Sequence, residues 1–165
     1  MEDINFLEKN ILLKQAPLLV ILDHIQDPQN FGSILRTSLG ARVYAINIPK
    51  DSACHLTPKV RKVSKAASEI IPVIVVSNLR NTVKMLQRNF IEIYACTGQA
   101  DLSFFEVDFQ GSKALIFGSE DKGIQKFLAN EANEKIKIPI DSRLESLNVS
   151  NATSVILFEA KRQRN

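Results

Sequence analysis

Three short polar segments carry the residue types that could do chemistry, and each follows a short apolar run. In the first, DPQNFGSILR from Asp27 to Arg36, the amide of Asn30 and the guanidinium of Arg36 stand out. At about 100° per residue, Arg36 points about 140° away from Phe31 around a helix and so leaves the apolar face. An arginine there is either a solvated surface residue or a clamp for phosphate or another anion. The segment alone leaves both interpretations open.

The second segment, FGSEDKG from Phe117 to Gly123, has two glycines around a polar loop. Glycine lets a ligand approach the backbone closely, which suits a binding loop. Glu120 in this loop is either a site residue or an ordinary acidic residue at the start of a helix, where a carboxylate is favourable.

The third segment, IPIDSRLESLNVSN, spans Ile138–Asn151. Ser146 is predicted to cap a final helix that runs from about Leu147 to Lys161. A helix that opens with Asn148 and further short polar residues has poor intrinsic propensity. A local rule broken just after a predicted strand points to function.

Other chemistries lack sequence support. No GxGxxG, GxxxxGK[ST] or GxSxG pattern occurs, which argues against a dinucleotide site, a P-loop and a hydrolase elbow. His24 is interpreted as a packing or hydrogen-bonding residue. Cys54 and Cys96 lie in no CxxC pair and near no cluster of metal-ligand spacing, so we expect no metal site. We expect both cysteines to be reduced thiols, as in a cytoplasmic protein. No apolar run approaches the ~20 residues of a membrane span, and the net charge of +3 permits an anionic partner without requiring one.

The elements that must position these segments alternate between strands and helices. Six apolar runs rich in Ile and Val show little polar alternation, which is typical of strands buried on both faces of a parallel sheet. We therefore predict an α/β domain over residues 16–165, with a mostly parallel sheet and helices on both faces. Residues 1–15 are expected to form a separate helix or the remnant of a linker. The predicted strands are Leu18–Leu22, Val43–Ile48, Val73–Val76, Ile91–Ala95, Ala114–Phe117 and Ile136–Ile138.

Capping residues predict where several helices begin. Asn30 is predicted to cap the helix that carries Arg36 and ends near Gly40. Thr57, which proline follows at the first helical position, and Asn78 are predicted to cap two further helices.

Taken together, the three segments resemble the motifs of the SpoU (TrmH) branch of the SPOUT RNA methyltransferases. They read LDHIQDPQNFGSILRT, ALIFGSEDKGI and IKIPIDSRLESLNVSNATSVILFEAKRQR, and the similarity extends from about Leu18 to Arg164. IPKDSACHLTPKVRKVSKAASEIIPVI, SNLRNTVKMLQ and FEAKRQR further resemble the RlmB-like subgroup, which methylates a guanosine ribose of 23S ribosomal RNA.

The resemblance implies an α/β fold with a deep C-terminal trefoil knot that forms a pocket for S-adenosylmethionine. It implies a homodimer that transfers the methyl group to a ribose 2′-hydroxyl of RNA, with ribosomal RNA favoured over tRNA. A tRNA ribose methyltransferase and a catalytically silent RNA-binding module are the alternatives.

The resemblance also implies roles for single residues. Arg36 is expected to hold the substrate phosphate and assist loss of the 2′-proton. Because an arginine is a poor neutral base, electrostatic stabilisation of the developing alkoxide suits it better than general-base catalysis. Asn148 is expected to position Arg36 or the ribose, and Ser146 to contact substrate or cofactor. The full set of matched catalytic positions is Asn30, Arg36, Glu120, Ser146 and Asn148, and the cofactor positions are Thr97, Gly118, Ile138 and Leu147.

RNA recognition is less well defined by the sequence. Related enzymes usually carry an N-terminal RNA-recognition domain, so we expect either an isolated catalytic domain or a different mode of recognition. Two basic helix faces are solvated surfaces or phosphate-tracking surfaces. They are formed by Lys59, Arg61, Lys62 and Lys65, and by Arg80, Lys84 and Arg88.

Overall fold

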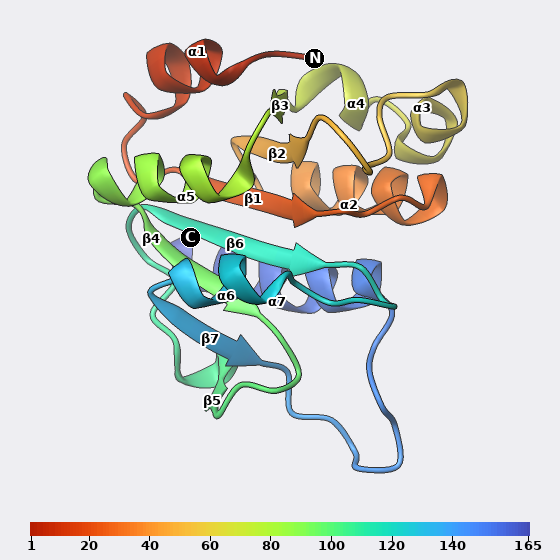
Figure 1. Cartoon of the computed structure of the whole chain (residues 1–165), viewed down its shortest axis with the longest axis vertical. Coiled ribbons are helices and arrows are strands. Elements are labelled where there is room, and N and C mark those ends of the chain that lie inside the picture. Colours follow the sequence, from red (N-terminus) through yellow and green to blue (C-terminus); the bar gives the residue numbers. More distant parts are fainter.

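A seven-stranded, all-parallel sheet organises the chain (Figure 1) in a computed structural model that describes residues 1–165. The strand order is β3-β2-β1-β6-β4-β7-β5. All six predicted strands are present, and the α/β prediction is confirmed. The short strand β5 was not predicted, because two residues give no periodicity. The strands are β1 (Leu18–Asp23), β2 (Ala45–Pro49), β3 (Val73–Val76), β4 (Glu92–Cys96), β5 (Leu102–Ser103), β6 (Lys113–Gly118) and β7 (Glu134–Lys137).

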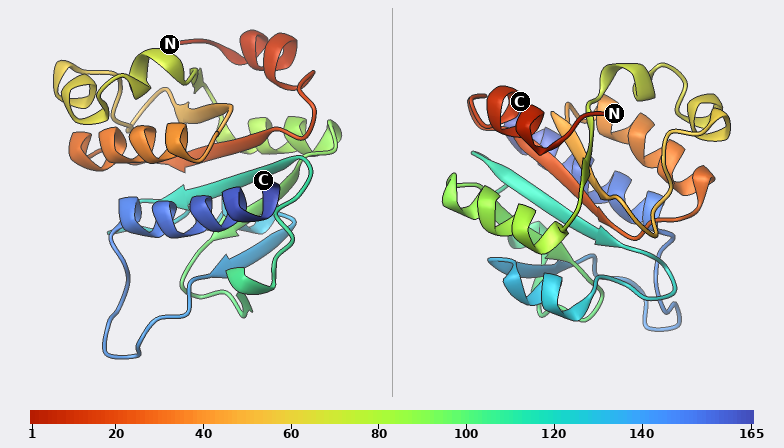
Figure 2. Two further views of the ribbon diagram at one scale, coloured as in Figure 1. Left: turned by 180° about the vertical axis from the view of Figure 1, so that it is seen from behind. Right: turned by 45° about the horizontal axis from the view of Figure 1, so that its top comes forward.

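Helices cover both faces of the sheet (Figure 2), which explains the unbroken apolar strands. Every residue of β1 is buried: Leu18 and Val20 join the core cluster on one face, and Leu19 and Ile21 join the cluster on the other. One face carries α2 (Pro28–Gly40), α3 (Pro58–Ser64), α4 (Ala67–Ile70), η2 (Phe104–Glu106) and α7 (Val149–Arg164); the other carries α1 (Ile4–Phe6), η1 (Leu7–Ile11), α5 (Leu79–Arg88) and α6 (Lys126–Glu131).

Two helix caps differ from the prediction. Asp27, rather than Asn30, caps α2 by accepting a hydrogen bond from the backbone of Asn30 at 2.8 Å. Asn148, rather than Ser146, caps α7, which starts at Val149. In both cases a carboxylate or amide near the helix start takes the unpaired backbone donors. The caps predicted at Thr57 and Asn78 are confirmed.

The first residues pack against the domain. Glu2 forms a bridge with Ile74 of β3, and Leu7 and Ile11 are buried in the core cluster on the α5 face. A domain boundary at residue 15 and the C-terminal knot stay predictions.

None of the helices combines the length and the apolar character that a membrane span requires.

Candidate active site

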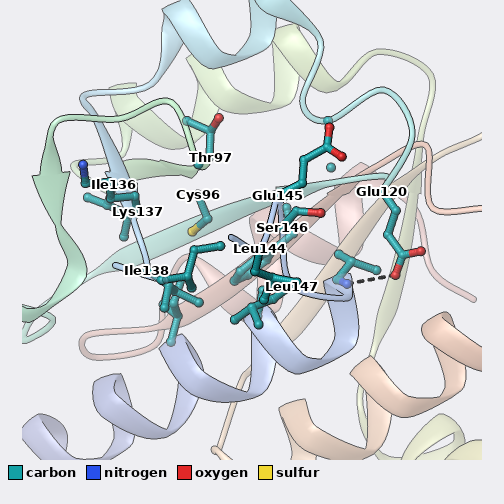
Figure 3. Close-up of a pocket in the computed structure, with 18 of the residues that line it drawn as sticks. Cys96, Thr97, Glu120, Ile136, Lys137, Ile138, Leu144, Glu145, Ser146 and Leu147 are labelled. Carbon is teal, nitrogen blue, oxygen red and sulfur yellow. Dashed lines mark hydrogen bonds between the residues drawn. The ribbon is translucent and has the colours of Figure 1, made fainter. Parts of the chain in front are cut away.

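A cavity of about 500 Å³ opens at the carboxyl edge of the sheet (Figure 3). Open parallel sheets bind their ligands at this edge, and the volume suits a small molecule. The ends of β4, β6 and β7, the 138–147 connection and the first turns of α7 form its walls. Six predicted site residues line it: Thr97, Gly118, Glu120, Ile138, Ser146 and Leu147.

The glycine loop after β6 forms one wall of the cavity. The Gly123 amide donates to the Ser119 carbonyl at 2.8 Å, and Gly123 has a φ of +64°. A Cβ placed on Gly118 would lie 2.1 Å from the carbonyl carbon of Gly123, so the two backbone segments touch directly. Only glycine at position 118 allows the loop to fold back this tightly.

The tip of that loop meets the start of α7 and α2 in one polar cluster. The Asn148 amide nitrogen donates to the Asn30 side-chain oxygen at 3.1 Å and also to Glu120. The Val149 backbone amide donates to the same Glu120 carboxylate at 3.2 Å, as Figure 3 shows. The structure thus brings one residue from each of the three segments into contact.

Arg36 stands apart from this cluster. It is exposed and forms no side-chain hydrogen bond or ion pair within the chain. Six residues beyond Asn30 on α2, it points about 120° away from Asn30 and lies about 9 Å further along the axis. No hydrogen bond joins Asn148 and Arg36 within one chain, and both roles expected for Asn148, positioning of Arg36 or of the ribose, stay predictions.

Sequence reasoning missed Asp23, which is fully buried at the end of β1. One carboxylate oxygen accepts from the Gln125 backbone amide at 2.6 Å, and the other lies 2.5 Å from Nδ1 of His24. Asp23 therefore anchors the segment after the glycine loop to the central strand. A charged residue at the end of an apolar strand was the available signal, since a buried carboxylate is costly unless hydrogen-bonded. His24 is the hydrogen-bonding residue that the sequence predicted.

Cys96 contributes a further wall of the cavity. Burial raises the pKa of its thiol, because a thiolate is poorly solvated there. The side chain therefore stays neutral and acts as an apolar surface at physiological pH.

Comparison with known proteins identifies the family. A sequence model described as the SpoU rRNA Methylase family matches residues 17–158. This chain belongs to that family. The match covers all three polar segments and confirms the resemblance stated from the motifs.

One relative and two solved structures show the extent of the likeness. The 23S rRNA (guanosine-2′-O-)-methyltransferase RlmB of Pseudomonas syringae pv. tomato is 40% identical over 148 residues, which are 90% of this chain and 59% of that protein. The A. aeolicus TrmH/SpoU tRNA modifying enzyme is 26% identical, with a TM-score of 0.80, over 91% of this chain and 76% of that one. AviRb from Streptomyces viridochromogenes, solved in complex with AdoMet, shares the fold with a TM-score of 0.85 at 24% identity, over 92% of this chain and 62% of that one. The chain spans about three fifths of the length of the curated relative.

Proposed function

We propose that this chain is the catalytic domain of an S-adenosylmethionine-dependent RNA methyltransferase, acting on a ribose 2′-hydroxyl, in the first place of a guanosine in 23S ribosomal RNA. The contact of Asn30, Glu120 and Asn148 beside the cavity carries the proposal. A simple binding module needs no such assembly of three motifs. The RlmB relative supports the ribosomal substrate, and the tRNA modifying enzyme of similar fold supports the alternative.

The cavity residues fit the cofactor. Ile138 and Leu147 supply apolar surface for an adenine ring, and the tightly folded backbone at Gly118 supplies polar groups without side-chain bulk. When bound, S-adenosylmethionine supplies an electrophilic methyl group, while the protein supplies orientation and electrostatics. The AdoMet complex of AviRb, which has the same fold, supports this assignment.

Arg36 and the polar cluster of Asn30, Glu120 and Asn148 have different roles in the proposed reaction. The Arg36 guanidinium stabilises the developing 2′-oxyanion and holds a neighbouring phosphate, which shares the proton. The Asn30–Asn148 pair, held by Glu120, orients the ribose through neutral amides.

The proposal includes a cytoplasmic homodimer with a C-terminal knot. Val155 and Phe158 on α7 are 41% and 49% exposed, an apolar surface that a second copy can cover. Because Arg36 faces away from the cluster of its own chain, a second copy also offers a way to complete the site.

Labelled methyl transfer tests the proposal. Unmodified 23S rRNA, 16S rRNA and tRNA are offered separately, and the product is mapped to a nucleotide. We expect label in 23S rRNA on a guanosine 2′-oxygen. Label in tRNA alone would establish the alternative substrate, whereas no transfer together with no binding of S-adenosylhomocysteine would contradict the proposal.

Substitutions of Asn148 separate its structural role from its functional one. Asn148→Ala should destabilise the fold by about 0.5–2 kcal/mol because α7 loses its cap, whereas Asn148→Ser keeps a good cap. Both should reduce methyl transfer by about 10-fold or more, since both remove the amide that bridges Asn30 and Glu120. Thermal unfolding and initial rates measure the two effects. Full activity of Asn148→Ser would show that the cap alone matters.

A further inference from the structure

The two basic helix faces differ in a way the sequence does not reveal. On α5, Arg80 forms an ion pair with Glu131 of α6 at 2.6 Å, and Lys84 lies 3.9 Å from the same carboxylate. Two of the three cations of this stripe therefore share one carboxylate within the fold, and Arg80 is tightly paired. A cation already paired with a carboxylate gains less from a phosphate.

The face around α3 is largely uncompensated. Residues 50–65 contain five Lys or Arg and one Asp, which gives this short segment a formal charge of +4 against +3 for the whole chain. Arg61 pairs with Glu69, but no carboxylate pairs with the exposed lysines. We define these as the lysine platform: Lys50, Lys59, Lys62 and Lys65.

The lysine platform lies at the same end of the sheet as the candidate site. Figures 1 and 2 show α3 beside the end to which β1 and β6 point, where the cavity opens. Two hydrogen bonds join the loop before α3 to the segment that precedes α2. Cys54 donates its amide to the Ile25 carbonyl at 2.8 Å, and the Gln26 side chain donates to the Ser52 carbonyl at 3.2 Å.

Close helix packing fixes the platform relative to Asn30 and Arg36. A Cβ on Gly32 would lie 2.6 Å from Cβ of Val63, so α3 contacts the backbone of α2 only two residues beyond Asn30. Arg36 lies one turn beyond Gly32 on the same side of α2. Arg36 therefore lies on the side of α2 against which α3, the helix that carries Lys59 and Lys62, packs.

We propose that the lysine platform binds the phosphates of the RNA strand that flanks the target nucleotide. The inference rests on the proposed function and assigns RNA binding to the α3 face, leaving the α5 face a solvated surface. Lysines act as point charges for phosphate. None of the exposed aromatic side chains belongs to residues 50–65, so no stacking platform for bases accompanies the lysines. The platform therefore contributes affinity and register, whereas the choice of nucleotide arises elsewhere.

Two triple variants that remove the same charge test the assignment. Lys59→Gln, Lys62→Gln and Lys65→Gln neutralise the platform, and Arg80→Gln, Lys84→Gln and Arg88→Gln serve as the matched control. Binding to unmodified 23S rRNA transcript is measured across a range of salt concentrations. Calorimetry with S-adenosylhomocysteine checks that both variants keep an intact cofactor site.

We expect the platform variant to bind RNA at least 10-fold more weakly. The slope of log affinity against log salt concentration should become less steep by about 2 to 3, since each lost phosphate contact contributes about 0.7–0.9 to its magnitude. The control should lose less than about 3-fold. In methyl transfer, the platform variant should show a raised KM for RNA and an unchanged kcat.

Equal losses in the two variants, or a larger loss in the α5 variant, would overturn the assignment. Weaker RNA binding with an unchanged KM would also overturn it, because the lost contacts would then be unproductive. The RNA affinities decide this inference, whereas transfer by the unsubstituted chain decides the proposed function, so the two can fail separately.

Discussion

Replacing Arg36 with alanine should lower the rate of methyl transfer by about 100-fold or more, while the affinity for S-adenosylmethionine changes by less than about 3-fold. Loss of one preorganised donor to a developing oxyanion typically costs 10²–10³ in rate, hence the size of the effect. The cofactor affinity should hold because Arg36 does not line the cavity and forms no side-chain hydrogen bond or ion pair within the chain. Single-turnover transfer and calorimetry measure the two quantities.

Arg88→Ala is the matched control, because it removes another exposed arginine from a helix on the opposite face of the sheet. It should leave the single-turnover rate nearly unchanged at saturating RNA. If cofactor binding collapsed with activity in Arg36→Ala, Arg36 would be a cofactor or folding residue. Activity retained in Arg36→Lys would show that a positive charge suffices without the planar, two-pronged geometry.

The placement of the site residues at one edge of the sheet could be predicted from the sequence. Parallel strands end at one edge of a sheet, so polar segments that follow separate strands lie along that edge. Glu120 follows β6, Asn30 follows β1, and both reach Asn148 at the start of α7. The contact itself depends on β1 and β6 being neighbours in the sheet, which the order of strands along the chain does not give.

The caps could not be assigned as easily, because neighbouring residues compete for the same backbone donors. Asp27 and Asn30 are both good capping residues, and Pro28, which suits the first helical position, decides in favour of Asp27. That outcome frees the Asn30 side chain for Asn148. The hydrogen bond between Asn30 and Asn148 thus depends on which residue caps α2 three positions earlier.

Local sequence patterns could not predict contacts between elements that are distant in the sequence. The pairing of Arg80 with Glu131 depends on the packing of α5 beside α6, and the anchoring of Gln125 by Asp23 depends on the return of the chain after β6. The direction of Arg36 around α2 was predictable from helical geometry, whereas its separation from Asn148 depends on where α7 packs.

Gly118→Ala should weaken S-adenosylmethionine binding by about 100-fold. The added methyl group would lie 2.1–2.3 Å from backbone atoms of Gly123 and Ile124, so the glycine loop must move away from the cavity that it lines. Overpacking costs about 1–3 kcal/mol, and the upper end is expected where the obstacle is backbone and cannot rotate aside. Each 1.4 kcal/mol is worth tenfold in affinity, and calorimetry measures the change.

Gly98→Ala provides the control, because Gly98 also lines the cavity but a Cβ there would meet no atom within 4 Å. Its cofactor affinity should stay within about 3-fold of the unsubstituted chain, since nothing has to move. Equal weakening in both variants would mean that added bulk in the cavity, rather than closure of the loop on Gly118, limits binding. A folded Gly118→Ala variant with unchanged affinity would mean that the loop does not contact the cofactor, and Glu120 would then act only by holding Asn148 in place.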